Sequence, residues 1–542
     1  MKQSNKLFVI ESPGKSGAFK KILSNLYPEG DFYVIATYGR LFDLPEKEIG
    51  FDPISFDSKS WVVSNEKSAN AVRRMSSLVD DVYLCTDNDV EGEVIASHVK
   101  HILGDKNFRR VRFNTIEEKH LREAISNARD LNSEIVSHGN KRRVLDRTIG
   151  YGFSNDKTPP FESVGRVLTP TLKSLSDSSF NKSSVYVDNM GDGISLKVDI
   201  KKEQMHLKDT LTYLIESAKK EVFELDEEHL VPNETQPWNY ADAVINISTA
   251  INESPSSVAD LLQENYEAGR LSYPRTDSRE LSEESIIALS RFASFCGVDE
   301  FSTDRIKKRI EVGNELYSPS SQGAHAAITV TDYRSVTPGI ALEDLSNNSS
   351  KVLKLISDNL LESGIESVER VASFKIDMSS DLGNFLNTNG LQYKAEKREK
   401  LKGRQFINDK KSKSKRVQDI DNRFDTFVFN LMVENDIGRP STWAYHTDKI
   451  IDKYTTDNEL NKRAFNALRY AEENLPGLLK PGAYSNVEKI LMTKSDFKES
   501  IMKGFEFLGV SSEVFEDQMI KKGYSQPSVS FKEKASDFTP DF

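Results

Sequence analysis

Short apolar segments alternate with amphipathic segments over residues 1–150, and this alternation limits the fold more than any other feature of the chain. Four segments are strand-like, namely residues 6–11, 32–36, 81–86 and 110–113. Helical patterns separate them, with apolar residues recurring about once per turn. Strands that alternate with helices predict a parallel α/β sheet. Later segments are helix-rich or β-rich, so we expect a multidomain α/β plus α and β fold.

Four acidic residues lie at the carboxyl ends of two of these strands, where parallel sheets bind their ligands. Glu11 closes the first strand, and Asp87, Asp89 and Glu91 follow the third. Mg²⁺ binds a few carboxylates and keeps several waters, so the set predicts a magnesium site. The alternative is that these acids only cap the helices that follow them.

Two familiar ion- and phosphate-binding loops are excluded at these positions. An EF-hand loop that started at Asp87 would need a glutamate at its twelfth position, which is His98. A phosphate-binding P-loop that ended at Lys15 would need a glycine where Val9 stands.

The segment Leu271-Ser-Tyr-Pro-Arg-Thr-Asp-Ser278 is the second candidate site. Tyr273 can attack phosphorus if its proton can leave and cations hold the phosphate, and Arg275 is such a cation. The alternative is a strand-to-turn junction with a core tyrosine, in which Asp277 and Ser278 cap a helix that begins near Glu280. The segment by itself favours the structural interpretation, and the acidic set upstream favours the chemical one.

Composition limits the class of protein. The chain has 542 residues, which suits three or four domains, and no apolar run is long enough to span a membrane. No apolar leader precedes the first strand, and Cys85 and Cys296 suit a reducing compartment, so we expect a soluble cytoplasmic protein. The net charge of −11 argues against a uniformly basic surface. It leaves nucleic acid open, because affinity depends on where the cations lie.

Seven motifs in collinear order resemble those of type IA DNA topoisomerases, over about residues 6 to 500. They are Val9-Ile-Glu-Ser-Pro-Gly-Lys15, Thr86-Asp-Asn-Asp-Val-Glu-Gly-Glu93, Val144-Leu-Asp-Arg147, Gly165-Arg-Val167 with Thr169-Pro-Thr-Leu172, Ser272-Tyr-Pro-Arg-Thr-Asp-Ser278, Gly323-Ala-His325 and Ile437-Gly-Arg-Pro-Ser-Thr442. The second of these resembles the acidic motif of a Toprim domain.

The resemblance implies a toroid of four domains around a hole that can hold DNA, with a Toprim domain first. The domains would be residues 1–150 (Toprim), 151–182 with 420–520 (helical, DNA-binding), 183–235 with 336–420 (β-rich hinge) and 236–335 (carrying Tyr273). Residues 521–542 would form a disordered tail that could dock a protein partner. We expect a monomer.

The resemblance also implies the chemistry. Tyr273 would attack single-stranded DNA, leaving a 5′-phosphotyrosine and a free 3′-hydroxyl, and no ATP is needed because the bond energy is conserved. Passage of another strand and religation would relax negative supercoils, decatenate DNA, or both. Arg275 would hold the phosphate, Lys15 would protonate the leaving oxygen, and Glu11 would lie between Tyr273 and the metal. Mg²⁺ would bind Asp87, Asp89 and Glu91. His325 would contact DNA and belong to the catalytic set. The other residues expected to contact DNA are Arg166, Asp277, Arg439, Ser441 and Thr442.

Some positions depart from the family pattern, and two other functions stay open. The departures are Arg40 for His, Val90 for Arg, Leu168 for Gln, Ala326 for an acidic residue and Trp443 for Tyr. A primase- or nuclease-like Toprim enzyme would share the acidic residues but would have no use for Tyr273. A DNA-binding clamp that has lost catalysis would account for the substituted positions.

Overall fold

The parallel sheet predicted near the N-terminus has four strands in the order β2-β1-β5-β6. The computed structural model describes residues 5–524 except 31, 58–59, 155–162, 179, 181–182, 188, 233–234, 308–325, 367, 403–416 and 422. β1 pairs in parallel with β2 and β5, and β5 pairs in parallel with β6. The strands are β1 (Lys6–Ile10), β2 (Phe32–Ala36), β5 (Asp81–Cys85) and β6 (Phe108–Arg110).

Helices cover both faces of this sheet, which explains the nearly continuous apolar run of β1. Phe8 and Ile10 pack on one face with α1 (Ser16–Leu26) and α4 (Glu118–Ser126). Leu7 and Val9 pack on the other face with α2 (Glu66–Ser76) and α3 (Val90–Leu103). A short hairpin of β3 (Phe42–Asp43) and β4 (Val62–Val63) adjoins the second face.

A long helix, α5 (Ser133–Gly152), connects the parallel sheet to helices from the far end of the chain. Its Val144, Leu145 and Ile149 share one core with sheet residues and with the C-terminal helices. Those helices are α17 (Ala483–Leu491), α18 (Phe497–Phe507) and α19 (Ser512–Lys521). A neighbouring core joins α6 (Leu168–Asp177), α14 (Phe424–Glu434), α15 (Pro440–Tyr454) and α16 (Lys462–Asn474).

A second sheet has six antiparallel strands in the order β12-β7-β8-β11-β10-β9. Buried and part-exposed residues alternate along β8, because α7 (Lys208–Ser217) and α13 (Asp381–Thr388) pack in the core on its inner face. The strands are β7 (Ser183–Val187), β8 (Ile194–Ile200), β9 (Phe223–Pro232), β10 (Val368–Ile376), β11 (Tyr393–Lys402) and β12 (Val417–Asp421).

The predicted nucleophile lies inside a helical unit, between its second and third helices. The helices of this unit are α8 (Tyr240–Ile251), α9 (Pro255–Glu267), α10 (Glu283–Phe295) and α12 (Asn348–Ser363). These helices share a core with Phe429 and Met432 of α14 and Trp443 of α15. Because α12 lies in this core, the proposed domain boundary at residue 336 falls inside one packed unit.

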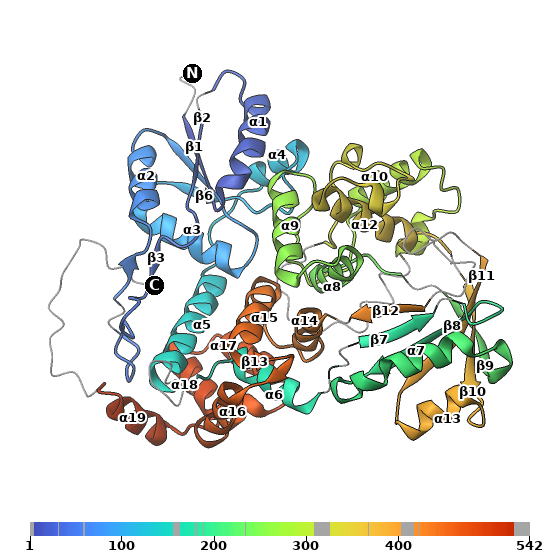
Figure 1. Ribbon diagram of the computed structural model, residues 1–542. Coiled ribbons are helices and arrows are strands. Elements are labelled where there is room, and N and C mark those ends of the chain that lie inside the picture. The colour runs from blue at the N-terminus through green and yellow to red at the C-terminus, as the bar shows by residue number, and fades with distance from the viewer. Residues whose placement is uncertain are drawn as a thin grey trace.

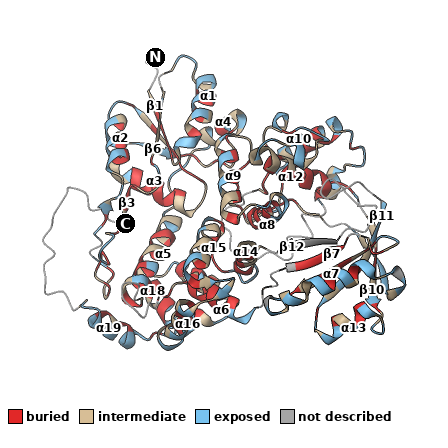
Figure 2. Ribbon diagram, in the orientation of Figure 1, coloured by how far each residue is buried: buried red, intermediate tan, exposed pale blue. Residues whose placement is uncertain are grey.

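The cores link the units into a closed circuit (Figure 1). The parallel sheet packs with α17 to α19, α14 and α15 pack with the α8–α12 unit, and Tyr266 and Tyr273 of that unit pack back against Phe8 and Ile10. Buried residues are prominent along α3 and α8, which contribute to separate cores (Figure 2). The predicted multidomain α/β plus α and β class is confirmed.

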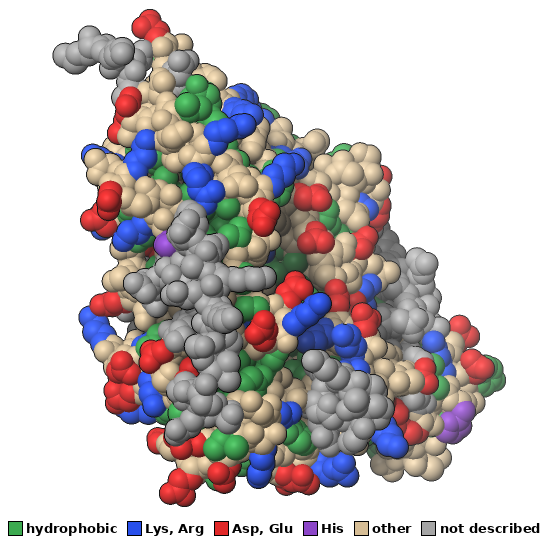
Figure 3. All heavy atoms as spheres, turned by 90° about the vertical axis from the view of Figure 1, so that its left-hand side faces the viewer, with side chains coloured by type: hydrophobic (Ala, Val, Ile, Leu, Met, Phe, Trp, Pro, Cys, Tyr) green, Lys and Arg blue, Asp and Glu red, His purple; other side chains and the backbone are tan. Residues whose placement is uncertain are grey.

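Charge is mixed over the surface. In a side view, Lys and Arg side chains are interspersed with Asp and Glu, with no division into a basic and an acidic half (Figure 3). Within the described ranges, every helix is too short or too polar to cross a bilayer.

Candidate active site

The two sites predicted from the sequence meet in the structure. The Tyr273 hydroxyl donates a hydrogen bond of 2.6 Å to Oδ2 of Asp89, 184 residues earlier in the chain. Oδ1 of Asp89 accepts the backbone N–H of Gly92 at 2.7 Å and so caps α3. The capping alternative therefore holds for Asp89, but the same carboxylate also contacts the tyrosine.

Tyr273 is held by its backbone as well as by its hydroxyl. Its N–H donates to the carbonyl of Asn114 at 2.7 Å, and its ring packs edge-on against Tyr266 at 5.3 Å between centroids. The side chain is 1% exposed. Burial first, and then the negative charges of Asp89 and Asp87, raise the pKa of Tyr273 well above its usual value, although Arg275 opposes this shift. In this arrangement Tyr273 is protonated and enclosed.

Lys15 and Glu11 flank the acidic loop. The buried Lys15 ammonium forms an ion pair with Asp87, and it lies 5.0 Å from the centre of the Tyr266 ring. Glu11 accepts the backbone N–H of Asp87 at 3.4 Å. Burial and the charges of Asp87 and Asp89 raise the pKa of Glu11 to about 8. Three carboxylates thus converge where their mutual repulsion is felt, which is the donor chemistry that suits a divalent cation.

Glu91, the third metal ligand in the prediction, has a different partner. Arg40 makes two hydrogen bonds to its carboxylate, the longer one at 2.8 Å, and holds the pKa of Glu91 below its usual value despite burial. Among the residues that the structure describes, no three His, Cys, Asp or Glu side chains form a ready-made metal site. In this structure Glu91 is paired with Arg40, and the predicted magnesium role of Asp87, Asp89 and Glu91 stays a prediction.

Arg110 holds the acidic loop in place, and the sequence prediction did not single it out. Its buried guanidinium donates to the carbonyls of Thr86 at 3.0 Å and Asp87 at 2.7 Å, and pairs with Glu93 at 3.0 Å. Glu93 also accepts the backbone N–H of Asn132 at 2.6 Å. The sequence signal that could have indicated this role is an arginine within a strand of the parallel sheet. A buried charge at such a position needs several partners.

Gly92 permits the tight approach of α3 to this loop. A Cβ atom at that position would lie 2.1 Å from the carbonyl oxygen of Asp87. The glycine is therefore required by space, and it brings the N-terminus of α3 against the acidic residues.

Arg275 lies beside the tyrosine, as predicted. Burial works against its charge, yet the pKa of Arg275 is raised because Tyr273 and Asp89 are close. Asp277 does not cap the next helix, because α10 begins at Glu283 and its N-cap is Ser282, which accepts the N–H of Ser285. That part of the structural alternative was wrong. His325 lies outside the described residues.

The predicted DNA-binding residues form a second group, around α15 and α17. Arg166 is 3% exposed and pairs with Asp146 and Glu488. Arg439 is the N-cap of α15, and its backbone N–H donates to Oγ1 of Thr442 at 3.0 Å. Ser441 is exposed on the same turn. Asp277 feels the charge of Arg439, which partly offsets the rise in its pKa caused by burial.

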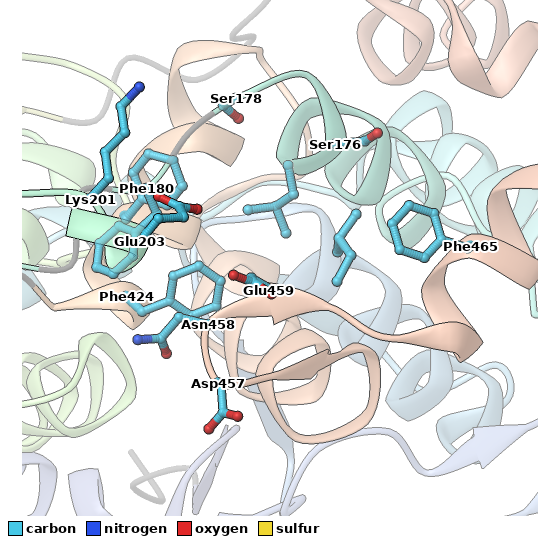
Figure 4. Close-up of a pocket in the computed structure, with 13 residues that line it drawn as sticks. Ser176, Ser178, Phe180, Lys201, Glu203, Phe424, Asp457, Asn458, Glu459 and Phe465 are labelled. Carbon is cyan, nitrogen blue, oxygen red and sulfur yellow. The ribbon is translucent and has the colours of Figure 1, made fainter. Parts of the chain in front are cut away.

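A cavity of about 460 Å³ lies apart from both groups, between α6, α16 and the hairpin of β13 (Thr455–Thr456) and β14 (Glu459–Leu460). Phe180 and Phe424 form part of its wall, and Asn458 and Glu459 from the hairpin lie beside Phe424 (Figure 4). None of the predicted site residues lines it.

Comparison with known proteins identifies the family. Residues 130–467 match the DNA topoisomerase family model, and residues 6–116 match the Toprim domain. The chain belongs to the type IA DNA topoisomerases. Its DNA topoisomerase 1 relatives include those of Mycoplasmoides gallisepticum (29% identical, covering 65% of this chain and 57% of that one) and Fervidobacterium islandicum (25% identical, 92% and 77%).

A solved relative extends the likeness to the fold. Full-length topoisomerase I from Thermotoga maritima superimposes with a TM-score of 0.64 at 20% identity, over 94% of this chain and 90% of that one. The topoisomerase chain described here spans 57% of its Mycoplasmoides relative and 62% of the Aquifex aeolicus DNA topoisomerase 1, to which it is 29% identical over 61% of its own length.

Substitution of Arg110 by Met should destabilise the N-terminal unit by roughly 3 kcal/mol or more, because buried carbonyls and Glu93 lose a charged partner. The measurement is the free energy of unfolding in urea. The neighbouring Arg109 is exposed, so Arg109→Met is the matched control and should change stability little. Equal effects of the two substitutions would contradict the role of Arg110.

The raised pKa of Glu11 predicts a pH dependence in the absence of divalent cations. The folded protein binds a proton that the unfolded chain releases near pH 4.5, so stability falls as the pH rises toward about 8. Between pH 6 and 9 in chelator, the thermal midpoint of wild type should therefore fall more than that of Glu11→Gln. Added Mg²⁺ should remove the difference. Parallel pH profiles would disprove the convergence of the three carboxylates.

Proposed function

We propose that this chain is a Mg²⁺-dependent, ATP-independent topoisomerase that cleaves and rejoins one DNA strand through Tyr273. The observation that carries the proposal is the hydrogen bond between the Tyr273 hydroxyl and Asp89 of the Toprim loop. A primase-like or nuclease-like Toprim enzyme would have no reason to place a tyrosine hydroxyl there.

The neighbours of Tyr273 suit the steps of such a reaction. Asp89 accepts the hydrogen bond of the attacking hydroxyl and so stands ready to receive its proton. Arg275 would stabilise the charge that develops on the phosphate. Lys15, close by on the other side of Asp87, would return a proton to the departing 3′-oxygen.

Magnesium would be held by Asp87 and Asp89 with Glu11 nearby, and when bound it would position the phosphate for religation. Lys15 and Tyr273 currently neutralise or hydrogen-bond these two aspartates. Both side chains would have to release them in part as the ion and the DNA enter.

DNA can reach Tyr273 only if the tyrosine unit separates from the Toprim unit, since the side chain is 1% exposed. Besides the Tyr273 contacts, Glu284 of α10 pairs with His120 of α4 at 2.6 Å and with Lys119. Single-stranded segments of negatively supercoiled or catenated DNA would be the substrate, and we propose that the chain acts as a monomer.

The test is relaxation of negatively supercoiled plasmid with Mg²⁺ and without ATP, comparing wild type with Tyr273→Phe. A ladder of topoisomers is expected from wild type alone, because the substitution removes only the attacking oxygen. Tyr266→Phe, at the adjacent ring, is the matched control and should retain activity. Covalent capture of a single-stranded oligonucleotide by its 5′ end should give the same pattern. Binding without capture would favour the inactive clamp.

Substitution of Glu284 by Gln should accelerate strand passage without changing cleavage of an oligonucleotide, because it removes a charge that holds the two units together. Exposed ion pairs are weak, so the gain should be roughly two- to fivefold at most. Decatenation and oligonucleotide cleavage are measured side by side. The matched control is Glu513→Gln on α19, which makes the same charge change away from this contact and should leave both rates unchanged. A slower decatenation by Glu284→Gln would refute the interpretation.

A further inference from the structure

Three arginines from three separate motifs gather around one buried tyrosine. Arg142 comes from α5, Arg166 precedes α6, and Arg439 begins α15. The guanidinium carbons of Arg166 and Arg439 each lie 5.2 Å from the ring centre of Tyr484 in α17. Nη2 of Arg142 lies 3.4 Å from the hydroxyl oxygen of that tyrosine. Tyr484 thus ties the three segments together through cation–π and hydrogen-bond contacts.

Glu488 lies one turn further along α17 and is also buried. One carboxylate oxygen accepts a hydrogen bond from Nη1 of Arg166 at 2.5 Å and forms an ion pair with Nε of Arg142 at 3.2 Å. The other lies 3.1 Å from Nε2 of His138. Burial alone would raise the pKa of Glu488, but Arg142 and Arg166 hold it well below its usual range, so the group is ionised. A single carboxylate therefore anchors two arginines.

The three arginines differ in what they can offer to a ligand. Arg166 is 3% exposed, and the rest of its fork is taken up by Asp146 at 2.7 and 2.9 Å. The side chains of Arg142 and Arg439 are 22% and 27% exposed. In this structure the Arg166 guanidinium is fully occupied by its partners. Arg142 and Arg439 are partly exposed, and Nη1 of Arg439 pairs with Asp436 at 2.8 Å.

We propose that Glu488 is a positioning residue that holds Arg142, and through Tyr484 also Arg439, in the geometry that binds phosphates of the DNA backbone. The inference rests on the proposed function. An arginine loses considerable side-chain entropy when it binds phosphate, and a buried anchor removes part of that loss in advance. Arg166, Tyr484 and Glu488 form the support, and Arg142 and Arg439 form the contact.

The experiment measures binding of the full chain to a labelled single-stranded oligonucleotide in chelator, over a series of salt concentrations, for wild type and Glu488→Gln. Positioning predicts roughly tenfold weaker binding and a salt slope lower by about one, as if one phosphate contact were lost. Simple charge neutralisation predicts the opposite, because removing a carboxylate near DNA leaves an extra positive charge. Tighter or unchanged binding by Glu488→Gln would overturn the inference.

Two further variants keep the result interpretable. Glu499→Gln changes the same charge on the exposed face of α18, where Glu499 pairs with Lys503, and should bind DNA as wild type does. Tyr484→Leu keeps an apolar side chain in the core but removes the ring face, and should weaken binding without the loss of a carboxylate. If Glu488→Gln does not fold, Tyr484→Leu decides the question: wild-type affinity of that variant would overturn the inference.

The covalent step separates this inference from the proposed function. Glu488→Gln should need more oligonucleotide for half-maximal capture through Tyr273. At saturating oligonucleotide, the extent of its capture should equal that of wild type. Loss of capture at saturation would contradict a positioning role confined to binding. Absence of capture by wild type would defeat the proposed function, while the binding comparison would still report on Glu488.

Discussion

The hydrogen bond between Tyr273 and Asp89 is the contact on which the closed circuit of the molecule depends. It joins the last link of the circuit, the α8–α12 unit, to the first, the parallel sheet. The buried Tyr273 hydroxyl is costly without a partner, and the half-buried Asp89 carboxylate supplies one only when the two units are docked. Tyr266 and Tyr273 also pack against Phe8 and Ile10, so apolar contacts stabilise the docked state in addition to the hydrogen bond.

The same contact bears on the proposed reaction, because it encloses Tyr273 and pairs it with a residue of the acidic loop. Asp87 and Asp89 are neutralised or hydrogen-bonded by Lys15 and Tyr273, the groups proposed to transfer protons. Separation of the units would expose the acidic residues to Mg²⁺ and the tyrosine to a phosphate together. Arg110 is independent of this change, because its partners all belong to the Toprim unit. It keeps the loop in shape while the loop changes partners.

The arginines around Tyr484 are positive charges that a carboxylate holds in place, in a protein that is acidic as a whole. The net charge is −11, and basic and acidic side chains are interspersed on the face shown in Figure 3. Around Tyr484, by contrast, Arg142 and Arg166 both pair with the buried carboxylate of Glu488. Affinity for a backbone of phosphates depends on such local geometry rather than on the sum of charges.

Local chemistry in the sequence determined the parallel sheet, the positions of Asp87 and Asp89 at the end of a strand, and the tyrosine and arginine of the Tyr273 segment. Periodicity and strand ends are properties of neighbouring residues, so they can be read without a fold. Only the tertiary structure decided that Tyr273 meets Asp89, that Glu91 pairs with Arg40, and that Arg166 is buried. Each of these depends on which distant side chain the fold places next to the group in question. No local sequence pattern encodes that placement. Arg110 and Glu488 escaped prediction for the same reason: a charged residue in a helix or strand looks like a solvated one until the fold encloses it and supplies its partners.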